Sequence, residues 1–251
     1  MRTALLLFLL LFLLSCAVQK SETPEYLTDS YGAVVKRGDV GKTVYLIFSA
    51  DSLFEGADTI LNVLKKHDIK GSFFLTGNCL RLQEHKETIK RLLAEKHYVG
   101  GHSDKHILYA DWDVNRTNLV TDDSLKCDIE ANYDELQRFG IKREQAQYYL
   151  PPYEWYNKQN IQAIKDYGVI PVNFTPRTYT PDDYTTPDMS NYRSSQYLLD
   201  KLMEYESKNT LDGAIILIHP GTSPKRSDKL YYHLDGIIET LKSKGYKFAR
   251  L

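Results

Sequence analysis

The sequence predicts an α/β fold in which buried parallel strands alternate with helices. Several apolar runs show no alternation of polar and apolar residues, among them 44–48, 170–174 and 214–218. Strands that are apolar on both faces are typical of parallel sheets covered by helices. Segments with helical spacing lie between the runs, and Gly140 and Gly245 follow two of them, where a helix commonly ends in a left-handed residue.

Taken in order, the patterns predict seven strands and six helices. The expected strands are 43–50, 71–77, 98–102, 147–152, 170–174, 213–219 and 247–250, and the expected helices are 53–67, 84–96, 124–139, 158–168, 194–208 and 229–244. Strict alternation implies right-handed crossovers, and therefore a parallel sheet that is either closed as an incomplete barrel or open and doubly wound. Two connections, 103–123 and 175–193, are unusually long, which is typical of functional loops.

The chain begins with a pattern typical of a secretion signal. Arg2 precedes an unbroken apolar run over 4–14, and a small residue and Cys16 follow it. Because the run is too short for a permanent membrane span, we expect a signal peptide over residues 1–15. The stretch Leu-Leu-Ser-Cys at 13–16 resembles a bacterial lipobox, in which the Cys is acylated; an ordinary secretory signal is the alternative. We therefore expect a membrane-anchored lipoprotein of the cell envelope, facing the periplasm or the cell exterior.

Composition bounds the domain organisation and the partners. The 32 basic and 33 acidic residues give a formal net charge of −1, which does not indicate a nucleic-acid partner. No Gly-, Ser- or Pro-rich linker divides the sequence, so we expect one catalytic domain over 41–251 behind a tether at 16–40. If Cys16 is acylated, Cys79 and Cys127 remain as thiols. They could pair, but two small buried residues are the preferred interpretation.

Polar residues collect at the carboxyl ends of the expected strands. Asp51 follows the first strand, His102 and His106 follow the third, Glu154 follows the fourth, and His219 ends the sixth. That edge of a parallel sheet is where sites are built. The two imidazoles at i and i+4 could grip one cation, although this spacing alone is also common in surface histidines; Asp51 would complete an Asp/His/His set with open positions. His219 is remote in sequence and suits a general acid.

The order of these residues resembles the NodB-type polysaccharide deacetylases. The features that carry the resemblance are Asp51 after a strand, H-S-x-x-H at 102–106, Pro-Pro-Tyr at 151–153, L-x-H at 217–219, and VLKKHDIKGSFFLTG at 63–77, which is similar to the family's first helix and second strand. The resemblance covers residues 43–251. It implies a distorted (β/α)7 barrel, a divalent metal held by Asp and two His, with zinc expected and cobalt or nickel as alternatives, and hydrolytic removal of N- or O-acetyl groups from a carbohydrate.

Two motifs depart from the family pattern. Members place T-F-D-D-G at the first strand, where the first Asp is the general base and the second binds the metal. Here Asp51 is the single carboxylate, displaced by one residue, and Ala50 occupies the base position. The family's R-P-P-Y-G is replaced by a segment from Leu150 to Glu154, so the Arg that pairs with the base is absent too. Glu154 or Asp104 could take the proton from water, and Glu154 is preferred; a solvated acid is the alternative for each.

Aromatic residues near these strand ends are candidates for binding sugar rings. Tyr153, Trp155 and Tyr156, together with Tyr109 and Trp112, are placed to line the mouth of the site. The expected partners are an acetylated oligo- or polysaccharide and a membrane. One alternative is a catalytically inactive pseudo-deacetylase that binds glycans as a lipid-anchored protein, since the base position is empty. A metal-dependent amidase acting on other substrates would share the site.

Overall fold

The computed structural model describes residues 26–38 and 40–251, so the predicted signal peptide and Cys16 lie outside the described residues. The strands are β1 (Tyr26–Thr28), β2 (Val34–Arg37), β3 (Thr43–Ala50), β4 (Ser72–Leu75), β5 (Tyr98–Gly101), β6 (Tyr148–Tyr149), β7 (Ile170–Pro171), β8 (Ile215–Ile218) and β9 (Lys247–Ala249). All seven strands expected from the sequence are present, several of them shorter than expected. β1 and β2 were not expected.

The helices also follow the predicted order. They are α1 (Ala57–Lys66), α2 (Gly77–Arg81), α3 (Lys86–Ala94), α4 (Asp122–Arg138), α5 (Lys158–Tyr167), α6 (Ser195–Asn209) and α7 (Leu234–Ser243), with 3₁₀ helices at Gln83–His85, Arg143–Gln145, Pro152–Glu154, Thr180–Tyr184 and Leu230–His233. Gly140 and Gly245 have φ of 78° and 88°, which confirms the predicted left-handed ends of α4 and α7. Within the described part of the chain, no helix has the length and apolarity needed to cross a bilayer.

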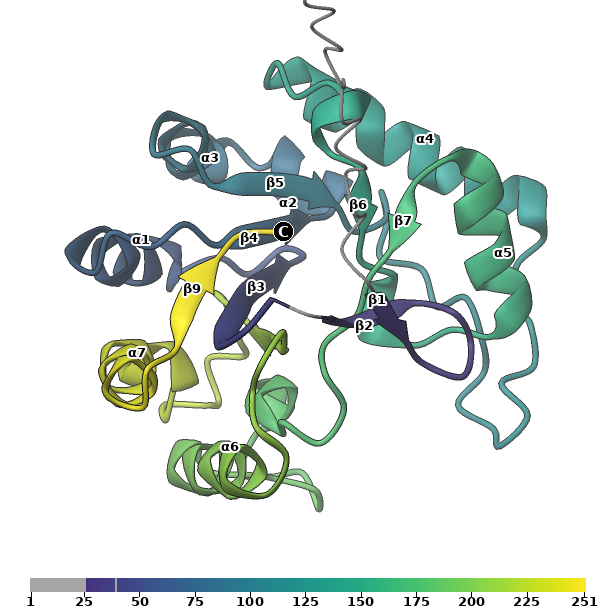
Figure 1. Cartoon of the computed structure of the whole chain (residues 1–251). Helices are drawn as coiled ribbons and strands as arrows, with labels where there is room; N and C mark the ends of the chain where they lie inside the picture. The colour runs from purple at the N-terminus through teal and green to yellow at the C-terminus, as the bar shows by residue number, and fades with distance from the viewer. Residues whose placement is uncertain (1–25, 39) are drawn as a thin grey trace, which may run out of the picture.

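Strands β3 to β9 form one sheet in which all pairings are parallel. The strand order is β7-β6-β5-β4-β3-β8, and β9 also pairs with β3. Because the strands from β3 to β7 are neighbours in chain order, the sheet winds in one direction, as in a barrel, rather than reversing as in a doubly wound sheet. The sheet curls and the long helices lie around its outside (Figure 1). The predicted distorted (β/α)7 barrel is confirmed.

β2 lies across the opening between the two ends of this sheet. Val34 forms a parallel bridge with Val172 beside β7, and Lys36 forms an antiparallel bridge with Ala214 beside β8. A backbone hydrogen bond of 2.8 Å accompanies the pairing on each side. Residues 26–37 are therefore part of the folded domain. The prediction that the tether extends to residue 40 is wrong for this segment.

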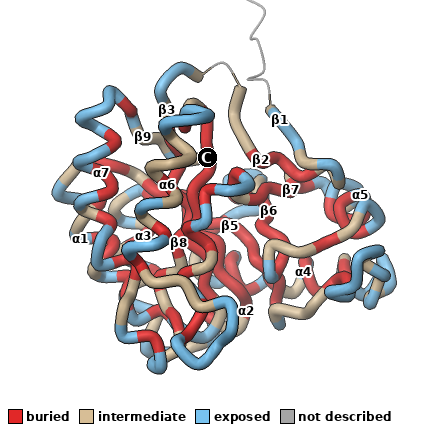
Figure 2. Tube along the Cα trace, turned by 90° about the horizontal axis from the view of Figure 1, so that it is seen from below, coloured by how far each residue is buried: buried red, intermediate tan, exposed pale blue. Residues whose placement is uncertain are grey.

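The core has two layers, one on each face of the sheet. Val44, Leu46 and Phe48 of β3 pack with the helices, whereas Tyr45 and Ile47 pack inside the barrel. Both sets are apolar, which explains why the strand sequences show no alternation. Buried residues follow the strands, and exposed residues lie mainly on the outer sides of the helices and in the loops (Figure 2).

The two described cysteines are not a pair. Cys79 is buried in α2, whereas Cys127 is exposed on α4, and both are free thiols. The prediction that both are small buried residues therefore holds for Cys79 and is wrong for Cys127, because α4 turns Cys127 toward solvent.

Candidate active site

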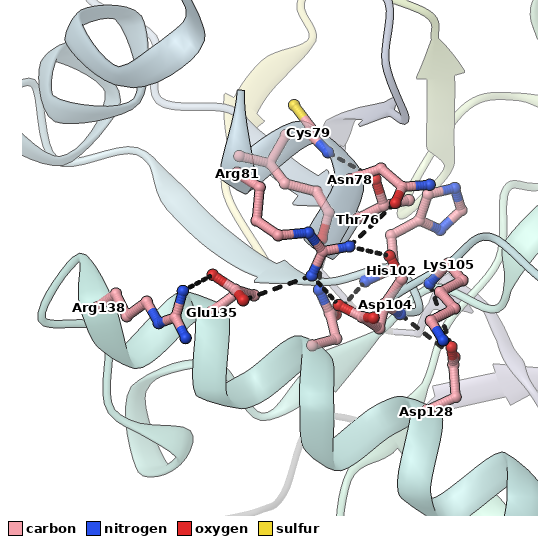
Figure 3. Close-up of polar contacts among 12 residues, drawn as sticks. Thr76, Asn78, Cys79, Arg81, His102, Asp104, Lys105, Asp128, Glu135 and Arg138 are labelled. Atoms are coloured by element: carbon pink, nitrogen blue, oxygen red, sulfur yellow. Dashed lines mark hydrogen bonds and ion pairs between the residues drawn. The ribbon is translucent and has the colours of Figure 1, made fainter. Parts of the chain in front are cut away.

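The loop after β5 carries the two histidines predicted to bind a metal, and α4 holds this loop in place. Asn132 Oδ1 accepts a hydrogen bond from the backbone N–H of His102 at 2.9 Å. The Asp128 carboxylate accepts from the backbone N–H groups of Asp104 and Lys105, at 3.2 Å each (Figure 3). The path of the loop is thus set by buried side chains of a helix that follows it in sequence.

His102 and His106 face each other at the edge of the sheet. His102 is 2% exposed, and its Nδ1 donates to the backbone oxygen of Leu150 at 2.8 Å, which leaves the Nε2 lone pair available. The centroid of its ring is 5.0 Å from that of His106. Burial lowers the pKa of both groups, well below the usual range for His102 and to about 4 for His106. Both imidazoles are therefore neutral near pH 7, the form that binds cations.

Asp51 follows β3 and lies near His106. Although burial lowers the pKa of His106, the negative charge of Asp51 raises it. Asp51 Oδ1 accepts from Thr76 Oγ1 at 2.9 Å and from Asn78 Nδ2 at 3.0 Å, so the carboxylate is held by the start of α2. Sequence reasoning missed these two residues. The available signal was the position of Thr76 between a strand and Gly77, because Thr is a preferred N-cap residue and here caps α2.

The donor chemistry of Asp51, His102 and His106 suits a divalent cation, since two neutral imidazoles and a carboxylate are typical zinc ligands. The three side chains nevertheless do not form a compact set. Over residues 26–38 and 40–251, one group of three potential ligands has donor atoms that all lie within 4.8 Å of one another. It lies elsewhere, at the end of α1 and on α7: His67, Asp235 and Glu239. The donor types of the three residues and the tautomer of His102 fit a metal. That the three side chains move together around an ion stays a prediction.

Glu154 ends the 3₁₀ helix after β6 and directs its carboxyl group into the site. Its Oε1 is buried without a hydrogen-bond partner and lies 3.8 Å from His102 Nε2. Burial raises the pKa of Glu154 to about 7, while the charge of His219 acts in the opposite direction. Tyr153 and Glu154 have φ of 58° and 52°, a region in which a residue with a side chain is strained. The strained turn therefore presents a carboxyl group that titrates near neutral pH.

His219 follows β8 and is paired with a buried acid that sequence reasoning missed. Asp183, 1% exposed, accepts from His219 Nδ1 at 2.5 Å and from its backbone N–H at 3.0 Å. Burial lowers the pKa of His219, but the charge of Asp183 and the hydrogen bond to it raise the pKa to about 9. His219 is thus protonated at neutral pH, and its Nε2–H can donate. The signal was the long loop 175–193, predicted to be functional, but nothing in the sequence singled out this acid.

Asp104, the second predicted proton acceptor, is engaged elsewhere. Its Oδ1 lies 2.5 Å from Nη1 of Arg81, which also contacts Glu135 Oε1 at 3.4 Å (Figure 3). A Cβ at Gly77 would collide with the Asp104 carboxylate, so this close packing requires glycine there. Asp104 is therefore a paired anion that ties the histidine loop to α2 and α4. Of the two acids, the structure brings only Glu154 to the histidines.

The predicted aromatic residues occupy unequal positions. Tyr153 is 44% exposed, and its ring centroid lies 4.3 Å from that of His106, so it borders the site. Trp155 is half-buried against the exposed Trp112, with ring centroids 5.2 Å apart. Tyr156 is fully buried, with hydrogen bonds of 2.7 Å to Asp29 and Asn173 that leave it no free surface. The prediction that Tyr156 lines the mouth is wrong.

Two further tyrosines differ in their position relative to the mouth of the site. Tyr109 is also fully buried, and its hydroxyl lies 2.6 Å from that of Tyr149, so its predicted place at the mouth is wrong too. Tyr184 is 48% exposed and its ring centroid lies 6.3 Å from that of His219. It borders the site on the His219 side and was not predicted.

Comparison with known proteins identifies the family. Residues 36–172 match the family model for polysaccharide deacetylases, which is more than half of the chain. The chain belongs to the polysaccharide deacetylase family. It is 26% identical over 227 residues to the peptidoglycan-N-acetylmuramic acid deacetylase PdaA of Bacillus subtilis, covering 90% of this chain and 76% of that protein. It is 29% identical over 227 residues to an uncharacterized 30.6 kDa protein of Geobacillus stearothermophilus, covering 90% and 75%.

Solved structures agree with the barrel fold. The structure of PdaA, a family 4 carbohydrate esterase, superposes with a TM-score of 0.66 at 24% identity, covering 88% of this deacetylase and 83% of PdaA. BA3943, described as a CE4 family pseudoenzyme from Bacillus anthracis, has a TM-score of 0.68 at 22% identity, covering 88% and 68%. As a family member, this deacetylase is a metal-dependent hydrolase that removes acetyl groups from a carbohydrate.

The departures from the family pattern can now be placed in the deacetylase fold. Glu154 stands where the pattern has Gly, and its φ of 52° is one that glycine adopts without strain. The backbone of the turn is thus one that the family's glycine would also adopt. This chain differs in carrying the side chain of Glu154 there. The nearby hydroxyl of Ser49 in β3 acts to lower the pKa of Glu154 and so favours its ionised form. The loop after β6 therefore brings a carboxyl group to within 3.8 Å of His102 Nε2, whereas β3 has Ala50 at the position of the family's base.

Proposed function

We propose that this deacetylase removes N-acetyl groups from the glycan strands of peptidoglycan, outside the cytoplasm. The observation that carries the proposal is that Glu154 and His219, from loops far apart in sequence, lie close enough to shift each other's pKa. Glu154 Oε1 also lies 3.8 Å from His102 Nε2. The choice of substrate is supported by PdaA, a relative whose name gives peptidoglycan as its substrate.

Asp51, His102 and His106 would hold a divalent cation, with zinc as the first candidate and cobalt or nickel as alternatives. Two neutral imidazoles and one carboxylate leave coordination positions open for water and substrate. When bound, the ion supplies Lewis acidity that polarises the acyl carbonyl and makes water a better nucleophile. The hydrogen bond from His102 Nδ1 to the Leu150 oxygen, 2.8 Å long, keeps Nε2 directed at the site.

The two protein groups move the protons. Glu154 Oε1, with no hydrogen-bond partner in the described chain, accepts the proton of the attacking water. His219, held by Asp183, donates its Nε2 proton to the leaving amine. Since the pKa of Glu154 is raised to about 7 and that of His219 to about 9, the base is ionised and the acid protonated between these values. The pKa values of the metal-free protein thus stand in the order that a base and an acid require, and the charge of a bound cation would lower both.

The test is metal-dependent acetate release by the full-length protein. Chelator-stripped protein should be inactive and should regain hydrolysis of acetylated peptidoglycan fragments on addition of zinc, cobalt or nickel. Glu154→Gln and His219→Asn should each lower kcat by roughly 100-fold or more. Absence of turnover on peptidoglycan fragments, acetylated sugars and acetyl esters, with metal content confirmed, would contradict the proposal.

A glycan-binding pseudo-deacetylase is the second candidate. Ala50 and Leu150 replace the family's base and its partner, and the chain resembles a structure described as a pseudoenzyme. In this case glycan binding would occur without hydrolysis and would be undiminished in Glu154→Ala and His219→Ala. The enzyme hypothesis instead expects both variants to lose acetate release, so the two candidates differ in one assay.

We further propose that Cys16 is acylated and anchors the deacetylase to a membrane at the cell envelope. The proposal rests on the apolar run at 4–14 followed by Leu-Leu-Ser-Cys. Cys16→Ser should move the protein from the membrane fraction to the soluble fraction and abolish incorporation of a labelled fatty acid. Unchanged membrane association and labelling in this variant would contradict the anchor.

A further inference from the structure

A row of stacked side chains extends outward from the candidate active site. It begins at His106, whose ring centroid is 4.3 Å from that of Tyr153. Tyr153 meets Trp112 edge to face at 5.8 Å, and Trp112 lies 5.2 Å from Trp155. The guanidinium of Arg116 then covers the Trp155 ring, with Cζ 3.4 Å from its centroid. The row is continuous from a predicted metal ligand to the surface of the loop between β5 and α4.

The members of this row differ in what they can offer to a ligand. Trp155 is half-buried, with Arg116 over its face, and its Nε1 donates to the backbone oxygen of Asp111 at 2.9 Å. Trp112 is 56% exposed. Trp155 therefore serves mainly as a support, and Trp112 presents the larger free aromatic surface. This revises the predicted role of Trp155 as a sugar-binding residue.

The loop that carries Trp112 is held by hydrogen bonds within itself and to the turn after β6. Ala110 pairs with Asn118 across the loop, and the backbone N–H of Asp111 donates to Thr117 at 2.8 Å. Arg116 Nη1 donates to the backbone oxygen of Tyr156 at 2.7 Å, which ties the loop to the turn after β6. An exposed indole held this firmly loses little conformational entropy when a ligand binds.

We propose that Trp112 is a second carbohydrate subsite, which stacks on a sugar ring of the same glycan adjacent to the ring bound at Tyr153. The inference rests on the proposed function, because it assumes a glycan substrate longer than one sugar. Pyranose rings have apolar faces that pack on flat aromatic side chains. Tyr153 lies between His106 and Trp112 and contacts both rings, so Trp112 is one aromatic side chain further from the site than Tyr153. Arg116 is a positioning residue that holds the indole through Trp155.

Tryptophan fluorescence reports on this subsite specifically. The chain contains two tryptophans, and both lie in the row. A tetramer of N-acetylglucosamine should change the emission of Trp155→Phe, in which Trp112 is the sole fluorophore. The change should be much smaller in Trp112→Phe. Metal-free full-length protein is used for this titration, so that binding is measured without hydrolysis.

Affinity ratios separate the subsite from the catalytic centre. Trp112→Ala should lower the affinity for the tetramer relative to the monomer by roughly fivefold or more, the scale of one aromatic contact. Arg116→Ala should cause a smaller loss, partly restored by Arg116→Lys. Tyr232→Ala is the matched control, since Tyr232 is 64% exposed and contacts Tyr231 outside the row.

Each outcome bears on one proposal. Tetramer binding that depends on Trp112, with no turnover of the tetramer, peptidoglycan fragments or acetyl esters by the metal-loaded protein, would support the subsite and contradict the proposed function. Hydrolysis of the tetramer with an unchanged tetramer-to-monomer affinity ratio in Trp112→Ala, and no emission change in Trp155→Phe, would overturn the subsite while leaving the proposed function in place.

Discussion

At the scale of single residues, Glu154 combines features that do not favour stability. Its backbone has a left-handed conformation, with φ of 52°. Its carboxyl group is buried, with Oε1 lacking a hydrogen-bond partner. A strained turn costs on the order of 1 kcal/mol or more, and a buried ionised carboxylate costs further free energy. A residue kept under both conditions at a site edge is more readily explained by chemistry than by folding.

The stability cost of Glu154 gives a test that does not depend on substrate. Its folded-state pKa is raised from 4.5 to about 7, so its protonated form is favoured on folding, and this stabilisation is lost as the pH rises from 4.5 through 7. Glu154→Gln cannot ionise. In the metal-free protein, Glu154→Gln should therefore raise the free energy of unfolding above that of the wild type. This increase should be about 2 kcal/mol larger at pH 8 than at pH 5.

The measurement is urea unfolding of both proteins at the two pH values. Glu130→Gln on α4 is the matched control, because Glu130 is exposed and its substitution should have a similar small effect at both pH values. An equal effect of Glu154→Gln at pH 5 and pH 8 would show that the carboxyl group is not destabilised by burial, and would weaken its assignment as the base.

His219 and Asp183 illustrate the opposite case, in which a buried charge is satisfied. The carboxylate of Asp183 accepts both the ring N–H and the backbone N–H of His219, at 2.5 and 3.0 Å. This pair outweighs the burial that would otherwise lower the pKa of His219. Because the folded-state pKa is raised, the stabilisation is complete below the usual pKa near 6.5 and is lost as the pH rises through about 9.

At the scale of elements, regular structure could be predicted well because the central strands β3, β4 and β8 are buried on both faces and each long helix has one apolar face. The strand 43–50 matches β3 (Thr43–Ala50) at both ends for this reason. β1, β2 and α2 were missed. They have three to five residues each, too few for a periodic pattern to be recognised.

The candidate site could be predicted in part. Strand ends located Asp51, both histidines of the loop after β5, Glu154 and His219, because parallel strands bring these ends to one edge. The partners that orient them could not be found, since Asp183 and Asn132 reach the site through tertiary packing of a long loop and of α4. Tyr156 was misplaced because neighbouring aromatic residues in an irregular turn point in different directions, which no period predicts.

α4 determines the geometry of the histidine loop more than the loop itself does. Asn132, Asp128 and Glu135 are all buried on the inner face of this helix. They reach the backbone of His102, the backbone of Asp104, and the Arg81–Asp104 ion pair. A polar face buried on a long helix is unusual in a structural element. Its presence here is explained by the buried backbone N–H groups of the histidine loop, which would lack hydrogen-bond partners without Asn132 and Asp128.

At the scale of the whole molecule, the sheet is not closed by its own strands. The order β7-β6-β5-β4-β3-β8 leaves β7 and β8 at its two ends, and β2 pairs with residues beside both. Ala33, Val34 and Val35 are at most 8% exposed, so this segment covers apolar interior. It also supplies Asp29, whose carboxylate accepts from the Tyr156 hydroxyl at 2.7 Å behind the turn that carries Glu154. The N-terminal segment thus supports the same turn that presents the proposed base.

This arrangement predicts that a chain starting at residue 41 is much less stable than one starting at residue 26. Removing the β2 segment removes two buried valines and uncovers the apolar neighbours that they pack against, a loss of about 4 kcal/mol from apolar burial alone. Thermal unfolding should show a lower midpoint for the shorter chain, with increased binding of a hydrophobic dye. Val34→Ala in the longer chain should lower the midpoint by a smaller amount, which keeps the test informative if the short chain fails to fold. Equal midpoints for the chains starting at 26 and 41 would mean that β2 lies on the barrel without closing it, and that Tyr156 and the Glu154 turn hold their positions without Asp29.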